Sequence, residues 1–353
     1  MKAIVMQGGS KAALVEDRPL PNLRPGYLLV KVAAVALNPT DWKHIDWHNR
    51  PNLLCGCDYA GTVAAVGTNC STSWKEGDRV CGMAHGGNKS QPEDGAFAEY
   101  IVAKADVQLK IPSHMSFAEA ATLGVGILTV GQGLYQAMGL KLPMEDEKEK
   151  DINKTTTGEY VLVYGGSTAT GALGIQSLRA SGYLPITTCS PHNFQYVASL
   201  GAVASFDYRR PDCAQAIKSY SHGNLRYAWD CISTERSAQI CAEALASAGE
   251  GDLRYGCLLP IDFPRKDVRV THTLAYTAIG EPFDQGWAKL AAGDTEDFKF
   301  AQKWVAVAQR LLERGLLKPH EPRIQPGGLE GVVEGLDILR NDSVSGQKLV
   351  YQL

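Results

Sequence analysis

The chain has 353 residues, of which 44% are hydrophobic and 21% charged, and its formal net charge is −3. This length predicts two domains, and the composition is typical of a soluble globular protein. A charge so close to neutral, without a long basic run, argues against a nucleic-acid partner. The chain starts with a short strand-like run, residues 1–6, which is too short for a signal peptide.

The first 110 residues predict a domain rich in short strands. Candidate strands, separated by Gly and Pro, are 27–36, 59–66, 78–81, 96–102 and 107–110. Ser116 and Glu119 form a capping-box pattern that predicts the first clear helix. The apolar stretch 118–140 carries five glycines, which favours a closely packed buried helix over a membrane span. The charged segment 144–158 predicts a solvated loop.

Nine cysteines are scattered along the chain, and Cys55 and Cys57 form the one close pair. An odd number of cysteines, with no C-x-x-C motif and no secretion signal, predicts reduced thiols in a cytoplasmic protein. Small buried side chains beside a tight turn are the expected role of that pair.

Residues 160–182 predict a strand, a turn of small residues and a helix. The strand is Tyr160–Tyr164, the turn runs over 165–171, and Gly182 ends the helical pattern. The first N–H groups of a helix lack partners within the helix and lie at its positive end, so this turn predicts an anion site. Thr168 and Ala169 replace the usual first glycines of G-x-G-x-x-G. A plain connecting turn is therefore the alternative.

A second strand, 184–188, follows at the distance where a dinucleotide fold reads the adenosine ribose. It ends in residues 189–193, Cys-Ser-Pro-His-Asn, which include no acid. An acid at this place would accept hydrogen bonds from both ribose hydroxyls and favour NAD. Its absence predicts NADPH as the cofactor.

From residue 160 onward strands and helices alternate, which predicts a doubly wound parallel sheet. Candidate strands are 160–164, 184–188, 203–206, 225–230, 253–259 and 268–279, and later helices are 298–314 and 329–340. The last strand, 348–353, is expected to rejoin the first domain. The predicted cofactor domain is thus 124–281, inserted between 1–123 and 282–353.

Motifs along nearly the whole chain resemble those of the medium-chain dehydrogenase/reductase superfamily. They are Gly56-x-Asp58-x-x-Gly61-x-Val63, Gly67, Gly77-Asp78-Arg79-Val80, Gly95-Ala96-Phe97-Ala98-Glu99-Tyr100 and the turn 165–171. More narrowly, segments 38–43, 164–170, 189–194, 206–209 and 225–232 resemble the stand-alone trans-acting enoyl reductases of fungal polyketide pathways.

The resemblance implies a fold, an activity and a partner. The fold is an α/β protein with a doubly wound, parallel-sheet Rossmann domain inserted in a discontinuous β-rich GroES-like catalytic domain. The activity is NADPH-dependent reduction of an α,β-unsaturated acyl thioester, by hydride transfer to the β-carbon. The partner is the acyl carrier protein of a highly reducing polyketide synthase, which holds the polyketide intermediate.

The zinc sites of many superfamily members have no counterpart in this sequence. The first catalytic ligand position reads Pro39-Thr40-Asp41, and the His-Glu pair is replaced by Cys57-Asp58. Residues 81–100 contain one cysteine, so a structural site of four cysteines cannot form there. No metal is therefore expected, which favours reduction of a conjugated C=C bond over alcohol oxidation.

The resemblance implies two catalytic residues, Lys43 and Thr129. Lys43, expected in a loop, would hold the cofactor ribose or nicotinamide, polarise the thioester carbonyl or relay a proton; a surface lysine is the alternative. Thr129 would contact the nicotinamide or the acyl carbonyl, and a threonine bonded to its own helix backbone is the alternative. Trp42 and Trp47 are candidates for the wall of an acyl channel, with buried structural tryptophans as the alternative.

Cofactor contacts are expected mainly around the glycine turn and the end of the second strand. The hydroxyls of Ser167, Thr168 and Thr170 should donate to the pyrophosphate. Ser190, His192 and Asn193 are the expected 2′-phosphate contacts, with Tyr208 at the adenine edge and Arg209 as a further or merely solvated charge. The complete expected set is Thr40, Asp41, Trp42, Lys43, Gly166, Ser167, Thr168, Ala169, Thr170, Cys189, Ser190, Pro191, His192, Asn193, Tyr208, Leu258, Leu259, Val344 and Ser345.

Substrate contacts are expected from two segments. The first, by the resemblance, is Val125, Gly126, Ile127, Leu128, Thr129 and Val130. The second is Tyr276, Thr277, Ala278, Ile279 and Gly280, placed at the end of the sixth strand, because strand ends of a doubly wound sheet face the ligand crevice. The same argument places Leu258 and Leu259 at the nicotinamide side.

Two other functions fit the same motifs. One is a free-standing, zinc-free quinone or alkenal reductase, and the other is a non-catalytic NADPH-binding scaffold. The substrate distinguishes the first, and tight cofactor binding without turnover distinguishes the second. Pro264, Glu281 and Pro282 flank the sixth strand and can blunt a sheet edge, which favours a monomer.

Overall fold

The computed structural model describes residues 1–143, 158–249, 251–290, 295–341 and 344–353. Of the segment 144–158, which was predicted to be a charged loop, residues 144–157 lie outside the described residues. The chain divides into two compact units. Unit 1 comprises Met1–Leu128, Ala275–Gln309 and Pro319–Leu353, and unit 2 comprises Thr129–Leu274 and Arg310–Lys318. Unit 2 is therefore inserted in the sequence of unit 1.

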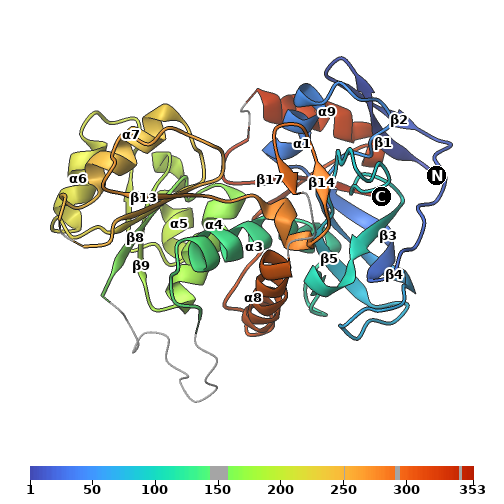
Figure 1. Cartoon of the computed structure of the whole chain (residues 1–353), viewed down its shortest axis with the longest axis horizontal. Coiled ribbons are helices and arrows are strands. Elements are labelled where there is room, and N and C mark those ends of the chain that lie inside the picture. The colour runs from blue at the N-terminus through green and yellow to red at the C-terminus, as the bar shows by residue number, and fades with distance from the viewer. Residues whose placement is uncertain (144–157, 250, 291–294, 342–343) are drawn as a thin grey trace. The chain divides into compact units, whose positions relative to one another are not determined.

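Unit 1 is built on a seven-stranded sheet with the order β16-β17-β3-β4-β5-β7, in which β6 pairs with β3 (Figure 1). The strands are β3 Tyr27–Ala36, β4 Asp58–Val66, β5 Arg79–Met83, β6 Tyr100–Lys104, β7 Leu109–Lys110, β16 Pro322–Gln325 and β17 Lys348–Gln352. Two further pairs are β1 Ala3–Gly8 with β2 Lys11–Val15, and β14 Phe283–Asp284 with β15 Lys289–Leu290. Because β17 pairs antiparallel with β3, the prediction that the last strand rejoins the first domain is confirmed.

The core of unit 1 is formed where the apolar positions of these strands meet. In β3, Leu28, Val30 and Val32 are buried while Lys31 between them is exposed, the alternation of a sheet with one face on the core. The predicted strand 96–102 is wrong at its start, since β6 begins at Tyr100. Before it, Ala96 and Phe97 both donate backbone hydrogen bonds to Cys55 O, so this stretch bends onto another loop instead of joining the sheet.

Unit 2 contains a six-stranded sheet with the order β10-β9-β8-β11-β12-β13, and every pairing in it is parallel. The strands are β8 Tyr160–Tyr164, β9 Leu184–Thr188, β10 Ala204–Phe206, β11 Tyr227–Asp230, β12 Arg254–Cys257 and β13 Arg269–His272. The helices are α4 Ala169–Ala180, α5 Phe194–Ser199, α6 Cys213–Tyr220 and α7 Glu235–Ala244, with α4 packed on β8 and β9 and α7 on β8 and β11 (Figure 1). The strand order is that of a Rossmann fold, so the predicted doubly wound sheet is confirmed.

The sixth predicted strand, 268–279, is too long. β13 ends at His272, and Ala275–Ile279 form a 3₁₀ helix. Tyr276, Ala278 and Ile279 of this helix are buried, and Ala275 already belongs to unit 1. The β-branched and aromatic pattern suggested a strand, but burial of these side chains in unit 1 decides their conformation instead.

The glycine-rich apolar stretch after residue 116 is helical. It comprises α2 Phe117–Ala120, α3 Gly124–Val130 and a π-helical segment, Gly131–Ala137, and the predicted capping box at Ser116 is confirmed. Among the described residues, Phe117–Ala137 alone is long and apolar enough to cross a membrane, and 83% of its apolar window is buried. A side chain at Gly133 would lie 2.6 Å from Trp229 Nε1, which is the close packing that the sequence predicted.

The remaining helices belong wholly or partly to unit 1. They are α1 Pro39–Trp47, α8 Thr295–Glu313 and α9 Gly328–Arg340. Lys43 therefore lies on a helix, and the predicted loop at this position is wrong. Asn38 starts that helix: Asn38 N–H donates to the Asp41 carboxylate at 2.7 Å, and Pro39 supplies a pre-set φ at the first helical position.

Candidate active site

The glycine turn of unit 2 is shaped by its backbone. A side chain at Gly171 would lie 2.3 Å from Gly165 O, and one at Gly166 would lie 2.0 Å from Thr187 Oγ1. Gly165 has φ +85°, which favours glycine. The close approach of α4 to β8 therefore depends on these glycines, although the sequence motif is degenerate.

Thr168 replaces a motif glycine as the N-cap of α4. Its hydroxyl accepts a hydrogen bond from Gly171 N at 3.0 Å and donates to Gly165 O at 2.8 Å. The hydroxyl is thus used inside the turn, whereas Ser167 and Thr170 beside it are partly exposed. The N-terminal end of this 12-residue helix has the free N–H groups and the positive dipole end that suit a phosphate.

The expected ribose site follows β9. Ser190 caps a 3₁₀ helix, Pro191–Asn193, in which His192 is exposed and Asn193 is buried. Cys189 N donates to Phe206 O at 3.1 Å, so the ends of β9 and β10 lie side by side. This brings Asp207, Tyr208 and Arg209 next to the segment 189–193.

Sequence reasoning did not single out Asp207, an acid at this edge. Its carboxylate accepts from Arg209 Nε at 3.0 Å and Arg209 Nη2 at 3.3 Å. These hydrogen bonds lower the pKa of Asp207, which stays ionised and compensates the charge of Arg209. The signal was present in the motif Phe206-Asp207-Tyr208-Arg209, where an acid follows a strand end.

Leu258 is positioned by a buried network around Asp230. Ser233 Oγ accepts from Leu258 N at 2.9 Å, and Ser233 N donates to Asp230 Oδ1 at 2.9 Å. Tyr255 OH donates to Asp230 Oδ2 at 2.8 Å, and burial raises the pKa of Asp230. Ser233 has φ +59°, a left-handed conformation that these hydrogen bonds hold in place. Ser233 was missed by sequence reasoning, because such a residue is recognised only once its backbone is known.

The carboxyl ends of the parallel strands gather most of the predicted cofactor residues at one edge of the unit 2 sheet. They are Gly166, Ser167, Thr168, Ala169 and Thr170 after β8; Cys189, Ser190, Pro191, His192 and Asn193 after β9; Tyr208 after β10; and Leu258 and Leu259 after β12.

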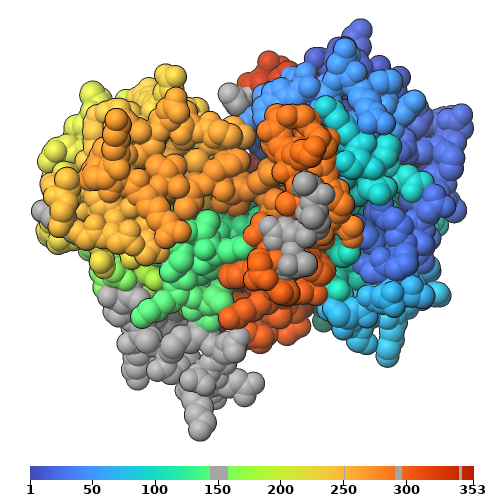
Figure 2. Space-filling model, in the orientation of Figure 1, coloured from blue at the N-terminus to red at the C-terminus, as the bar shows by residue number. Residues whose placement is uncertain are grey.

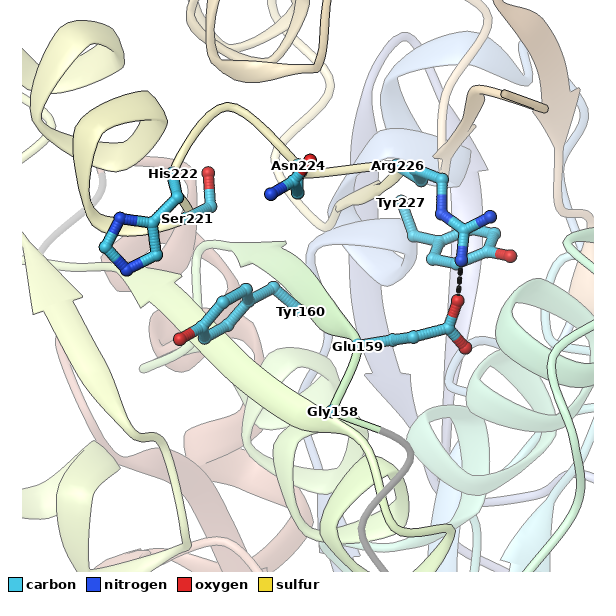
Figure 3. A pocket seen from close by; sticks show the side chains of 8 residues that line it. All are labelled: Gly158, Glu159, Tyr160, Ser221, His222, Asn224, Arg226 and Tyr227. Atoms are coloured by element: carbon cyan, nitrogen blue, oxygen red, sulfur yellow. Dashed lines mark hydrogen bonds and ion pairs between the residues drawn. The ribbon is translucent and has the colours of Figure 1, made fainter. Parts of the chain in front are cut away.

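A cavity of about 390 Å³ lies at the other end of these strands, where their amino ends are. Figure 3 shows it between the amino ends of β8 and β11, with Arg226 pointing toward Glu159 in an ion pair. Its lining is Gly158, Glu159, Tyr160, Ser221, His222, Asn224, Arg226 and Tyr227. Because ligands of doubly wound sheets bind at the carboxyl ends of the strands, this cavity is at the wrong edge for a dinucleotide.

In unit 1, α1 carries four of the predicted cofactor residues. Asp41 is buried, its carboxylate accepts the Asn38 N–H, and burial raises its pKa to about 7. Trp42 and Lys43 are partly exposed, and Lys43 Nζ lies 5.6 Å from the Trp42 ring centre. Trp47 is 48% exposed and packs edge-on against Trp287, so the alternative of a buried structural tryptophan is wrong for Trp47.

Thr40 belongs to a buried polar cluster. Thr40 Oγ1 lies 2.7 Å from Tyr276 OH and 3.5 Å from His44 Nε2, and Cys57 Sγ lies 3.6 Å from the same tyrosine oxygen. His85 stacks on the Tyr276 ring at 4.1 Å. Thr40 and Cys57, which lie in the two segments compared above with zinc-ligand positions, thus both contact one phenol. Within the described ranges, no group of three or more His, Cys, Asp or Glu is placed to hold a metal ion.

Tyr276 to Gly280 are held by the segment that follows them. Lys104 forms an ion pair with Glu281, Asp284 N donates to Ser90 Oγ at 3.0 Å, and Lys89 Nζ donates to Gln285 O at 3.0 Å. In Figure 2 this orange segment lies against a cyan surface of the same unit.

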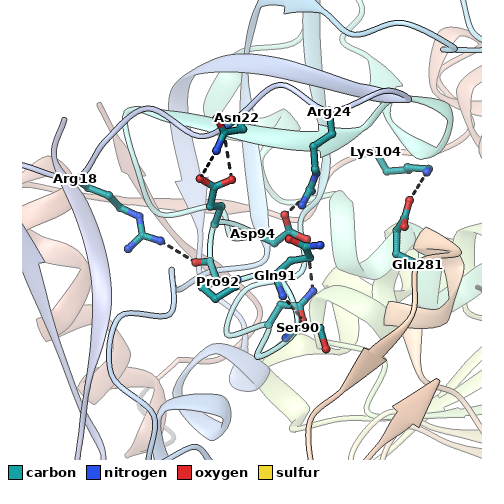
Figure 4. Close-up of polar contacts among 11 residues, drawn as sticks. Arg18, Asn22, Arg24, Ser90, Gln91, Pro92, Asp94, Lys104 and Glu281 are labelled. Atoms are coloured by element: carbon teal, nitrogen blue, oxygen red, sulfur yellow. Dashed lines mark hydrogen bonds and ion pairs between the residues drawn. The ribbon is translucent and has the colours of Figure 1, made fainter. Parts of the chain in front are cut away.

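The loop 88–94, which contains Lys89 and Ser90, also binds the N-terminal segment of unit 1. Figure 4 shows Arg24 directed at Asp94, in an ion pair with a distance of 2.5 Å. Asn22 Nδ2 donates to Glu93 at 2.9 Å, and Arg18 Nη2 donates to Pro92 O at 2.7 Å. The loop 88–94 is thus fixed on two sides.

The segment 125–130 is positioned by Asp58. Asp58 Oδ1 accepts from Val125 N at 2.6 Å, at the start of α3, and its other oxygen pairs with Lys348. Trp304 Nε1 donates to Ile127 O at 2.7 Å. Thr129 is buried on the last turn of this helix. Val344 and Ser345 precede β17, with Ser345 exposed.

Comparisons with known proteins agree with this architecture. The alcohol dehydrogenase GroES-like domain family matches residues 24–113. Solved structures with the same fold include the CurK enoyl reductase, with TM-score 0.74, 19% identity and coverage of 99% of this chain and 98% of that one. Another is the quinone oxidoreductase of Coxiella burnetii, with TM-score 0.73, 24% identity and coverage of 100% and 99%. The GroES-like match and these structures show that the chain has the fold of the medium-chain dehydrogenases/reductases.

Curated relatives narrow this class. Trans-enoyl reductase resD of Aspergillus sclerotiorum is 49% identical, with coverage of 100% of both chains. Trans-enoyl reductase TOXD of Cochliobolus carbonum is 48% identical, over 80% of this chain and 91% of its own. The chain belongs to the trans-enoyl reductases, oxidoreductases that act on C=C bonds. The resemblance predicted from the sequence is confirmed, and the fold implies a nicotinamide cofactor.

Proposed function

We propose that this protein uses NADPH to reduce the α,β-unsaturated acyl thioester of a polyketide intermediate. The intermediate is held on the acyl carrier protein of a highly reducing polyketide synthase. The observation that carries the proposal is full-length identity of 49% with a trans-enoyl reductase. The Rossmann sheet order and the closely packed turn before α4 support it independently.

The residues at the carboxyl edge of the unit 2 sheet fit the cofactor. The N-terminus of α4, with Ser167 and Thr170, would hold the pyrophosphate. Ser190, His192 and Asn193 would hydrogen-bond a 2′-phosphate, and Arg209, paired with Asp207 at the neighbouring strand end, would offer its remaining N–H donors. A mycobacterial protein of the same fold, with TM-score 0.72 and 20% identity, was solved in complex with NADPH. When bound, the cofactor supplies the hydride for the β-carbon.

The catalytic work left to the protein is orientation and charge stabilisation. Lys43 and Thr129 would donate hydrogen bonds that stabilise the negative charge developing on the thioester oxygen. Val125–Val130 and Tyr276–Gly280 would contact the acyl chain. Thr40 and Asp41, committed to internal hydrogen bonds, would act by holding α1 and the Tyr276 side chain.

The test follows NADPH absorbance with the purified protein and crotonyl-pantetheine or a 2-methyl-enoyl pantetheine thioester. NADH replaces NADPH in one control, and a quinone replaces the thioester in another. Thioester-dependent oxidation of NADPH supports the proposal. Oxidation by the quinone alone would identify a quinone reductase instead, and tight NADPH binding without any turnover would identify a binding protein. Faster turnover with NADH would reject the cofactor assignment.

We also propose a cytoplasmic monomer. β13, an edge strand of the unit 2 sheet, has four residues, and a short edge strand is a poor template for pairing with a second copy. All nine cysteines are free thiols in the structure, as in a reducing compartment. Sedimentation equilibrium at micromolar concentration tests the monomer, and a tight dimer would reject it.

A further inference from the structure

A phenol, a hydroxyl, a thiol and two imidazole rings meet inside unit 1. Tyr276 OH is 2.7 Å from Thr40 Oγ1 and 3.6 Å from Cys57 Sγ. His44 Nε2 is 3.5 Å from Thr40 Oγ1, and the His85 ring is stacked on the Tyr276 ring, with an interplanar angle of 16°. These contacts hold the tyrosine hydroxyl at one place, with a second hydroxyl directly behind it.

The direction of the hydrogen bonds follows from one backbone carbonyl. His44 Nδ1 lies 2.9 Å from Gly86 O, which only accepts, so Nδ1 carries the hydrogen. Burial lowers the pKa of His44 to about 4, so the ring is neutral and Nε2 is an acceptor. The Thr40 hydroxyl then donates toward Nε2, and its oxygen accepts from Tyr276. The resting chain runs from Tyr276 to Thr40 to His44.

Reduction of a conjugated thioester leaves one proton to be supplied. Once the β-carbon has accepted a hydride, the substrate is an enolate, and its α-carbon must gain a proton. We propose that the Tyr276 hydroxyl donates this proton and that the Thr40 hydroxyl stabilises the phenolate left behind; this inference rests on the enoyl reductase function proposed above.

The step balances without a further reactant except solvent. The electron pair of the enolate C=C bond forms the new C–H bond, while the O–H bond of Tyr276 breaks and its pair stays on the phenolate oxygen. For this step the Tyr276 O–H turns from Thr40 Oγ1 toward the enolate, and the Thr40 hydroxyl turns from His44 Nε2 to the tyrosine oxygen. Each is a rotation of a neutral hydroxyl about its C–O bond. Water restores the phenol after the saturated product has left.

The backbone supports a fixed position for the acid. Tyr276 lies in the 3₁₀ helix Ala275–Ile279, which Gly280 ends with φ +73°. Tyr276, Ala278 and Ile279 of this helix are buried in unit 1, so the acid lies on a packed element. The ring stack on His85 and the contact with Thr40 hold the ring and the hydroxyl oxygen in place.

The experiment compares Tyr276→Phe with wild type on a 2-methyl-enoyl pantetheine thioester and NADPH, in H₂O and in D₂O. Phe keeps the ring stack and removes only the acid. The experiment measures turnover and the solvent isotope effect. NMR determines the configuration of deuterium at the α-carbon. The matched control is Tyr59→Phe, a buried tyrosine of the same unit whose hydroxyl donates to Gln108 Oε1 at 2.9 Å.

We expect Tyr276→Phe to lower turnover about 10²-fold, the lower end for loss of a general acid. It should also alter the solvent isotope effect and give both configurations at the α-carbon, while Tyr59→Phe gives one. A single configuration with the wild-type isotope effect in Tyr276→Phe would overturn the inference. If Tyr276→Phe does not fold, Thr40→Val and Thr40→Ser are compared instead. Thr40→Val should lower turnover and stereospecificity, and Thr40→Ser, which keeps the hydroxyl, should retain both. Equal effects of the two substitutions would overturn the inference.

The activity of the wild-type protein separates the role of Tyr276 from the proposed function. A wild-type protein that reduces no enoyl thioester removes both. A wild-type protein that does so, together with a fully active and stereospecific Tyr276→Phe variant, removes only the role of Tyr276.

Discussion

Lys348 and Asp58 form an ion pair from which solvent is almost entirely excluded, with 4% and 0% of the two residues exposed. The Lys348 ammonium also donates to Asn38 Oδ1 at 2.9 Å and to Thr122 O at 3.4 Å. The other Asp58 oxygen accepts from Val125 N at 2.6 Å. One pair therefore ties β17 and β4 to the start of α1 and the start of α3, which carry the predicted catalytic residues.

Removing one partner of this pair should be costly. Lys348→Met leaves the Asp58 carboxylate buried without a counter-charge, and we expect a loss of about 3–5 kcal/mol in the free energy of unfolding. Asp58→Asn combined with Lys348→Met should recover part of this loss, because no buried charge remains. Urea titration measures both.

The matched control is Arg210→Met, which breaks a solvent-exposed pair with Asp212 and should leave the free energy of unfolding almost unchanged. A Lys348→Met variant as stable as this control would show that the buried Lys348–Asp58 pair does not stabilise the fold.

Each buried neutral histidine should make the protein less stable as the pH falls, against the opposite contribution of Asp41, whose pKa burial raises to about 7. Burial lowers the pKa of both His44 and His320 from 6.5 to about 4. A lowered pKa in the folded state means that the unfolded chain binds protons first. The stabilisation is therefore complete above pH 6.5 and is lost as the pH falls toward 4, at about 1.4 kcal/mol per pH unit for each group.

Unfolding free energies measured between pH 7 and 5 check this dependence. His44→Asn should reduce the slope by about 1.4 kcal/mol per pH unit. The same change at His114, which is exposed, should leave the slope as in wild type. Equal slopes for wild type and His44→Asn would show that His44 does not titrate as stated.

The glycine turn offers a test of the cofactor site. Ala at Gly171 would bring its methyl group to 2.3 Å from Gly165 O and 2.9 Å from Gly166 Cα, so the backbone of β8 and α4 must move apart. We expect a destabilisation of about 1–3 kcal/mol and a loss of NADPH binding measured by fluorescence. At Gly223 nothing lies within 4 Å and only its φ of +74° is unfavourable, so Gly223→Ala should bind NADPH normally.

Lys43→Ala should fold normally and lose turnover. The side chain is partly exposed on α1, so little packing is removed, whereas loss of one donor to a developing oxyanion costs about 10²-fold in kcat. Steady-state kinetics with the pantetheine thioester measure this, with Lys31→Ala, an exposed lysine of β3, as control. Wild-type turnover in Lys43→Ala would remove Lys43 from the mechanism.

Thr129→Val should lower turnover more than stability. Valine has nearly the same shape, so the buried site stays filled, and only the hydroxyl of Thr129 is lost. We expect a decrease of about tenfold in kcat, with a change of about 1 kcal/mol in the free energy of unfolding. Unchanged kcat would instead assign the hydroxyl to its own helix backbone.

The alternating strands and helices after residue 160 were predictable because each depends on local pattern. The buried run Tyr160–Tyr164, the small-residue turn and the helix ending before Gly182 all appear at the predicted positions. The helix that carries Lys43 was not predicted. It begins with a cap formed by Asn38, Pro39 and the Asp41 carboxylate, and the family motif 38–43 does not by itself indicate a helix. The 3₁₀ helix at Tyr276 was not predictable from β propensity, because its buried side chains decide its conformation.

By itself, the sequence determined the family, the doubly wound sheet and most of the residues at its carboxyl edge, because strand ends follow from local periodicity and topology. Only the tertiary structure decided which distant groups meet. Lys348 lies 290 residues from Asp58, and Tyr276 lies 236 residues from Thr40. Contacts of this kind form when packing excludes water from polar groups that must then find partners, and no local pattern in the chain specifies the choice.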